Sequence, residues 1–89
     1  MFRRNFSKDK ALLFTFPKER KFDIHTFFVF FSIDLVYLNE GFEIIEIEED
    51  VSPFRGYSPE KEAKNLVEFR SGKVDEENLE LGDRLEVIE

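Results

Sequence analysis

The chain has 89 residues, of which 42% are hydrophobic and 16% aromatic, and its formal net charge is -7. This length predicts a single domain over residues 1–89, and the absence of cysteine excludes a disulfide framework and a zinc–thiolate site. No apolar run is long enough for a signal peptide or a membrane span, so we expect a cytoplasmic protein without a membrane partner. The high Lys and Glu content is compatible with a thermophilic source.

The charge is distributed unevenly along the chain. Residues 1–21 carry seven basic and two acidic side chains, a balance of +5, whereas residues 22–89 carry six basic and eighteen acidic ones, a balance of -12. A nucleic-acid-binding domain normally presents a positive face to the phosphates, so this acidic body argues against nucleic acid as the partner. We expect the basic segment to be a solvated arm, or a strand that neutralises part of the acidic body.

The N-terminal part predicts one or two strands. The first ten residues have no clear period, so they are either frayed or form a first strand. Residues 11–16 alternate, which places Leu12, Phe14 and Phe16 on one face of a strand. We expect Pro17 to end that strand because proline has no amide hydrogen for the ladder.

The aromatic stretch from His25 to Leu38 organises the predicted fold. It contains four of the twelve phenylalanines and several β-branched residues, so it favours a strand over a helix. Its length, at about 3.3 Å per residue, would span roughly 46 Å, which exceeds the roughly 30 Å width of a domain of this size. We therefore expect a break or bulge at Ser32, with one strand ending near Phe31 and a second over residues 33–38.

The two faces of this stretch differ in character. The odd-numbered positions from 25 to 37 are nearly all apolar and predict a buried face. The even-numbered positions include Thr26, Ser32 and Asp34, so Phe28 and Phe30 are either covered by a second layer or exposed as an apolar patch.

A hairpin is predicted after the central stretch. The triplet Asn-Glu-Gly that ends at Gly41 is a turn signal, and Gly41 is the residue that we expect in the left-handed conformation of a three-residue loop. Residues 42–49 supply the returning strand, so residues 33–48 predict an antiparallel hairpin. Two prolines and a glycine in residues 51–59 then predict a long surface loop.

The C-terminal third predicts two strands and one short helix. Residues 65–69 and 84–88 read as strands, and residues 72–78 as a helix whose last residue, an asparagine, takes the left-handed conformation. Leu79 and Leu81 are expected to pin this helix to the core. Together, six or seven short strands predict a mainly β fold, a compact antiparallel β-sandwich or partly closed barrel with one short helix before the last strand.

Five sequence runs, in order and spacing, resemble a small prokaryotic family. They are LLFTFP from Leu12, IHTFFVFFSIDLVYLNEGFEIIEI from Ile24, SPFRGYSP from Ser52, AKNLVEFRSG from Ala63 and LELGDRLEV from Leu79. This set resembles the family catalogued as domain of unknown function 192. The resemblance implies a compact β-rich fold with a short helix before the last strand, and it brings no assigned activity. Asp34 and Glu68 match acidic positions of the family pattern, whereas Ser32 stands where a proline is common.

His25 and Asp34 are the candidates for acid–base chemistry. His25 is the only histidine, and an aspartate across from it could orient the imidazole as a general base. The alternative is structural, with His25 hydrogen-bonded to backbone and a buried Asp34 held by loop amides or by Arg55.

The sequence shows no further catalytic or cofactor-binding pattern. Ser52, Ser58 and Thr26 lack a nucleophile elbow, and there is no phosphate loop, dinucleotide fingerprint or metal-binding helix motif. The acidic run over residues 46–50 lacks the spaced oxygen ligands of a calcium loop and reads as a solvated strand end. We therefore expect neither a cofactor nor a metal.

The loop of residues 53–57 is the strongest candidate for binding. Phe54, Arg55 and Tyr57 are residue types that are enriched at interface hot spots, and Glu68 completes the predicted ligand-binding set. The alternative is a lid whose two aromatic rings pack on the core while the arginine pairs with Glu68 or with the buried aspartate.

Three functions are compatible with these features. The one that we favour is a non-catalytic module that binds a small ligand or a protein through the loop of residues 53–57. The second is a small enzyme that uses His25 and Asp34 in a pocket, which requires the two side chains within hydrogen-bonding reach. The third is a structural homodimer formed through exposed phenylalanines.

Overall fold

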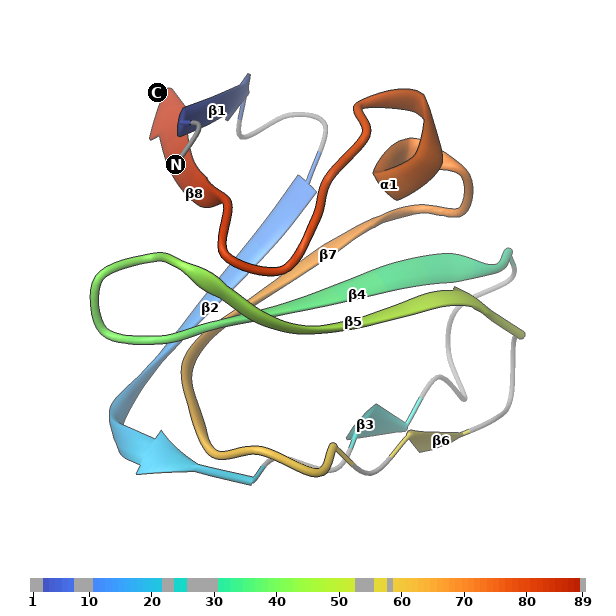
Figure 1. Cartoon of the computed structure of the whole chain (residues 1–89). Coiled ribbons are helices and arrows are strands. Elements are labelled where there is room, and N and C mark those ends of the chain that lie inside the picture. The colour runs from blue at the N-terminus through green and yellow to red at the C-terminus, as the bar shows by residue number, and fades with distance from the viewer. Residues whose placement is uncertain are drawn as a thin grey trace.

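A computed structural model of the chain describes residues 3–7, 11–21, 24–25, 31–52, 56–57 and 59–88 (Figure 1). These residues form β1 (Arg3–Ser7), β2 (Ala11–Arg20), β3 (Ile24–His25), β4 (Ile33–Leu38), β5 (Ile44–Val51), β6 (Gly56–Tyr57), β7 (Ala63–Arg70), α1 (Lys73–Glu76) and β8 (Arg84–Ile88). The prediction of a mainly β fold with one short helix before the last strand is confirmed. The described residues contain eight strands, however, and not six or seven.

The strands form one larger sheet and two small ones. The larger sheet has the order β2-β7-β4-β5, with antiparallel neighbours throughout. The small sheets are β3 with β6, which is antiparallel, and β1 with β8, which is parallel. These sheets are not a closed barrel, and the predicted sandwich is not confirmed. The parallel β1–β8 pair also departs from the antiparallel prediction, because the first strand lies beside the last one.

The larger sheet carries a buried cluster on each face. Val36, Leu38 and Val67 belong to a cluster that includes Val74 of α1. Leu35, Tyr37 and Leu66 belong to the other cluster. We call these sides the α1 face and the ribbon face, since the β3–β6 ribbon lies on the side of the sheet away from α1 (Figure 1).

Strand β4 is buried at all six positions because the sheet is covered on both faces. The side chains of β4 therefore alternate between the two faces as expected, but both faces are buried. Odd-numbered residues such as Leu35 point to the ribbon face, and even-numbered ones, including Asp34 at 0% exposure, are equally buried on the α1 face. Ser32 lies outside the strand, and β4 begins at Ile33 as predicted. Phe28 and Phe30 lie outside the described residues.

Strand β2 continues past Pro17 to Arg20, so the prediction that proline ends it is wrong. The ladder with β7 is nevertheless interrupted there, since Thr15 pairs with Asn65 and the next pair is Arg20 with Ala63. A proline fits this position because β2 is an edge strand and the interrupted ladder requires no amide hydrogen from it.

The hairpin between β4 and β5 is confirmed, but its left-handed residue is Phe42 (φ 63°) and not Gly41. The Phe42 amide donates to the Asn39 carbonyl, and the Asn39 side chain accepts from the amides of Gly41 and Glu43. This is the three-residue loop in which a turn is followed by a left-handed residue. Phe42 packs against the cluster on the α1 face, and this burial offsets the cost of its backbone conformation.

Helix α1 is shorter than the predicted range of residues 72–78. Gly72 precedes it with φ 97°, and Asn78 follows it with φ 54°, which confirms the left-handed asparagine. Leu79 is buried as expected, whereas Leu81 is 63% exposed and does not pin the helix. A turn at Gly82 and Asp83 leads into β8, with φ 92° at the glycine.

Candidate functional site

Asp34 is a fully buried carboxylate whose two oxygens accept three hydrogen bonds from backbone amides. Its Oδ1 accepts a hydrogen bond from the amide of Asp50 at 2.8 Å. Its Oδ2 accepts from the amides of Gly72 at 3.1 Å and Val74 at 3.0 Å. One buried carboxylate thus joins β4 to the end of β5 and to the start of α1. Of the two expected structural partners, loop amides are present, and Arg55 lies outside the described residues.

Two irregular backbone positions direct these amides towards Asp34. Asp50 has φ 55° and lies where the β4–β5 register shifts between Ile33 and Leu35, which is the position of a β-bulge. Gly72 has φ 97°, a conformation that L side chains rarely adopt. Asp50 is further tied to the loop before α1, since its Oδ1 accepts from the Ser71 hydroxyl at 2.7 Å. The local backbone is therefore shaped around the carboxylate.

Glu68 contrasts with Asp34 because neither a hydrogen bond nor an ion pair is found for its carboxylate among the described residues. Glu68 lies on β7 directly between Leu12 of β2 and Leu35 of β4. Its side chain is half-buried, and desolvation by burial raises its pKa above the usual 4.5. A half-buried carboxylate without a partner is a candidate for ligand contact.

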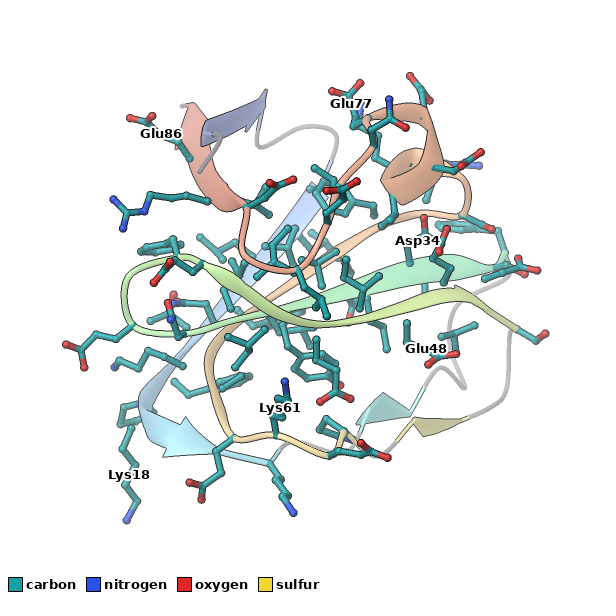
Figure 2. All side chains as sticks on the ribbon, viewed as in Figure 1. Lys18, Asp34, Glu48, Lys61, Glu77 and Glu86 are labelled. Atoms are coloured by element: carbon teal, nitrogen blue, oxygen red, sulfur yellow. The ribbon has the colours of Figure 1, made fainter. Side chains whose placement is uncertain are left out.

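The register places Glu68 on the ribbon face, opposite Asp34. Leu35 pairs with both Glu68 and Glu48, so these three side chains form one row across the sheet. Figure 2 shows Asp34 on the side of α1 and Glu48 on the side of β3 and β6. Glu68 therefore faces the side of the sheet on which the β3–β6 ribbon lies.

The β3–β6 ribbon places two predicted site regions next to each other, although they are far apart in the sequence. The backbone of His25 pairs with Gly56, and that of Ile24 pairs with Tyr57. The proposed acid–base residue and the proposed binding loop are therefore neighbours along the backbone ladder. Phe54 and Arg55, and the side chains of His25 and Tyr57, lie outside the described part, so the His25–Asp34 pair and the ligand set stay predictions.

Glu46, the first residue of the acidic run of residues 46–50, has a structural role. Both carboxylate oxygens of Glu46 accept from the Glu60 amide, at 3.0 and 3.1 Å, and one also accepts from the Lys61 amide at 2.9 Å. The described residues contain no group of three or more side chains that could hold a metal ion. Glu46 thus fixes the bend that leads into β7.

Sequence reasoning missed a groove beside β5. It has a volume of about 400 Å³ and is lined by Ile45, Glu46, Ile47, Glu60, Lys61 and Leu81. These residues come from three separate segments, and one of them, Leu81, is exposed instead of lying in the core as the sequence predicts. The available signal was the acidic alternation of β5, which is typical of a strand with an open edge.

Comparison with known proteins identifies the family. The model of DUF192, described as Uncharacterized ACR, matches residues 1–87. The UPF0127 protein of Thermococcus sibiricus is 35% identical over an alignment of 78 positions, and the match covers 85% of this chain and 50% of the relative. The UPF0127 protein of Pyrococcus furiosus is 34% identical over 78 residues, covering 85% of this chain and 66% of the relative. The chain thus spans half to two thirds of these relatives, which come from thermophilic archaea.

Solved structures share the fold. A Sinorhizobium meliloti protein, provisionally assigned as a transcription regulator, gives a TM-score of 0.80 at 22% identity and covers 94% of this chain and 67% of its own. A protein of unknown function from Novosphingobium aromaticivorans gives 0.74 at 9% identity, with 81% and 53% covered. Within the described residues, α1 falls far short of the length and apolarity that a bilayer-crossing helix needs. By the match over residues 1–87, the chain belongs to the DUF192 family, whose members also carry the name UPF0127.

Proposed function

We propose that the chain is a non-catalytic binding module whose ligand site lies on the ribbon face. In this proposal Glu68 is the charged contact, and the loop of residues 53–57 borders the site. The observation that carries it is the half-buried Glu68 carboxylate, for which no partner is found among the described residues and whose pKa is raised by desolvation. A cationic group on a ligand would supply the missing partner and lower that pKa.

The surroundings of Glu68 suggest the rest of the ligand. Leu12, its register neighbour on β2, is 60% exposed, and Phe14 on the same face is 41% exposed. Apolar side chains beside a single carboxylate suit a ligand that joins an ammonium or guanidinium group to an apolar body. The ligand can be a small amine or a basic side chain of a protein.

The bonding of Asp34 supports binding over catalysis. Three backbone amides already occupy this carboxylate, and it is 0% exposed on the face away from the ribbon. A general base must reach the proton that it removes, either directly or through one water. Asp34 is therefore better suited to holding the fold than to orienting His25.

The test uses phenethylamine as the probe and 2-phenylethanol as its neutral counterpart. In ¹H–¹⁵N spectra, we expect phenethylamine to shift the amides of Leu12, Glu68 and Gly56, with affinity in the millimolar range, about -4 kcal/mol. Glu68→Gln should abolish these shifts, and His25→Ala should leave them intact. Glu48→Gln is the matched control, because Glu48 lies in the same row on the far side of Leu35. Equal binding of the alcohol would contradict the proposal.

The exposure of Leu12 and Phe14 also favours a second candidate, a structural homodimer formed through the β2 edge. Sedimentation analysis distinguishes the two candidates. A dimer predicts a mass that rises with protein concentration and returns to that of the monomer in Leu12→Lys. The binding module predicts a monomer at all concentrations.

A further inference from the structure

We propose that the outer edge of β5 is a second binding site, separate from the ribbon face, that takes an extended peptide with alternating apolar and basic side chains. The peptide would add a strand to the sheet and place one apolar side chain in the groove beside β5. Three features of the described residues support this inference: the shape of the groove, the state of the strand edge and the charge along it.

The groove lies across the edge of the sheet and not on one face. Ile45 packs with the cluster on the ribbon face, whereas Ile47 packs with the cluster on the α1 face. Both line the groove, so its floor is the edge of β5 itself. Its volume of about 400 Å³ falls in the range of ligand pockets, about 300–1,000 Å³. Leu81, which is 63% exposed, supplies an apolar wall that the core does not use.

The same edge already pairs with another segment of the chain, the turn that leads into β8. The Ile44 amide donates to the Asp83 carbonyl at 2.7 Å, and the Gly82 amide donates to the Ile44 carbonyl at 2.8 Å. The Leu85 amide donates to the Phe42 carbonyl at 2.9 Å. Beyond Ile44, β5 is the last strand of its sheet in the part of the chain that the structure describes. A peptide that pairs with residues 45–48 would continue this pairing along the edge.

The charges along the edge select the peptide. Glu48, Glu49 and Asp50 follow the groove residues on β5, and Glu60 lies on the groove wall. Lys61 is the single basic residue of the lining. The amides of Glu60 and Lys61 donate to the Glu46 carboxylate, which fixes the position of these two residues at the groove wall. Acidic side chains on an edge oppose pairing with another acidic strand and favour a basic one.

The test uses the peptide acetyl-Lys-Val-Lys-Val-Lys-amide, with acetyl-Glu-Val-Glu-Val-Glu-amide as the charge-reversed control. We expect the basic peptide to shift the amides of residues 45–48 in ¹H–¹⁵N spectra and to slow their hydrogen exchange. Its affinity should fall as salt increases because the attraction is electrostatic. Equal binding of the acidic peptide, or shifts confined to the ribbon face, would overturn the proposal.

A matched pair of variants separates this site from the ribbon face. Leu81→Lys places a positive charge on the groove wall and should weaken the basic peptide at least about tenfold, since burial of one leucine contributes that much. Leu12→Lys alters a leucine of nearly equal exposure, 60% against 63%, on the opposite edge strand and should leave peptide binding unchanged.

The proposal fails if Leu81→Lys binds the peptide as well as the parent chain does. It also fails if the wild-type protein shows concentration-dependent self-association instead of peptide binding. Phenethylamine binding at Glu68 tests the other site, so either site can fail without the other.

Discussion

Asp34 and Glu68 lie on neighbouring strands of the same sheet but face opposite sides of it. Asp34 is fully buried and accepts three backbone amides, whereas no partner is found for the half-buried Glu68 carboxylate among the described residues. Burial of a carboxylate is costly unless hydrogen bonds replace its hydration. The α1 face meets that requirement with its own backbone, whereas the described part of the ribbon face supplies no hydrogen bond to Glu68.

Burial alone therefore does not identify a functional residue in this protein. The more buried acid, Asp34, has the structural role, because the amides at the Asp50 bulge and at the left-handed Gly72 both donate to its carboxylate. The less buried acid is the better site candidate, since its surroundings disfavour its charge without compensating for it.

The largest effect is expected for Asp34→Ala. This change leaves the amides of Asp50, Gly72 and Val74 without their acceptor, at roughly 1–3 kcal/mol for each buried unsatisfied group. We expect a loss of about 3 kcal/mol or more in the free energy of unfolding, measured by guanidinium denaturation. Since that can exceed half of the total stability, Asp34→Asn, which keeps one carbonyl oxygen, should give a smaller, measurable loss.

Glu49→Ala is the control for the aspartate variants. Glu49 precedes the bulge residue and is exposed, so its removal should change stability by no more than about 0.5 kcal/mol. Equal losses for Asp34→Ala and Glu49→Ala would show that the amide contacts do not hold the α1 face together.

The sequence predicted the role of Asp34 better than its location. An aspartate between apolar neighbours must find partners if buried, and loop amides were one of the two options. The amides of residues 50, 72 and 74 could not be identified from spacing, because they are 16, 38 and 40 residues away. Only the tertiary arrangement brings them together.

At the β4–β5 turn, the sequence predicted the location correctly but the wrong residue for the left-handed conformation. Glycine preference correctly located the hairpin but assigned the left-handed conformation to Gly41, one residue too early. The Phe42 ring packs against the cluster on the α1 face, a tertiary contact that the local sequence does not reveal. The surroundings of Glu68 were predictable only in part, since the sequence singled out Glu68 but strand register was needed to place it beside Leu12.

An intermediate effect is expected for Asn65→Ala, a second test of the bonded α1 face. Asn65 is 1% exposed, accepts from the Thr15 hydroxyl at 2.8 Å and donates to the Asn39 carbonyl at 3.1 Å. Its loss should cost about 1–3 kcal/mol in the same denaturation experiment. Thr15→Ser keeps the hydroxyl and should stay within about 0.5 kcal/mol of the parent chain. A neutral Asn65→Ala would mean that water replaces both contacts.

The smallest effect, of opposite sign, is expected for Glu68→Gln. A carboxyl whose pKa is raised on folding holds its proton more tightly in the folded state, so its charge costs stability as pH rises above the unfolded value of 4.5. Removing the charge should therefore stabilise the protein at pH 7, and this gain should shrink as the pH falls through 4.5 and the carboxyl becomes protonated in both states. Because the side chain is half exposed, we expect a gain of about 0.5 kcal/mol.

Thermal unfolding at pH 4 and pH 7 measures the difference, with Glu48→Gln as the partner variant in the same row. An equal gain in Glu48→Gln would assign the effect to the net charge of -7 and not to the position of Glu68. A loss in Glu68→Gln at pH 7 would mean that the carboxylate already has a favourable partner. In that case the protein itself would satisfy both acids, and Glu68 would no longer be supported as a ligand contact.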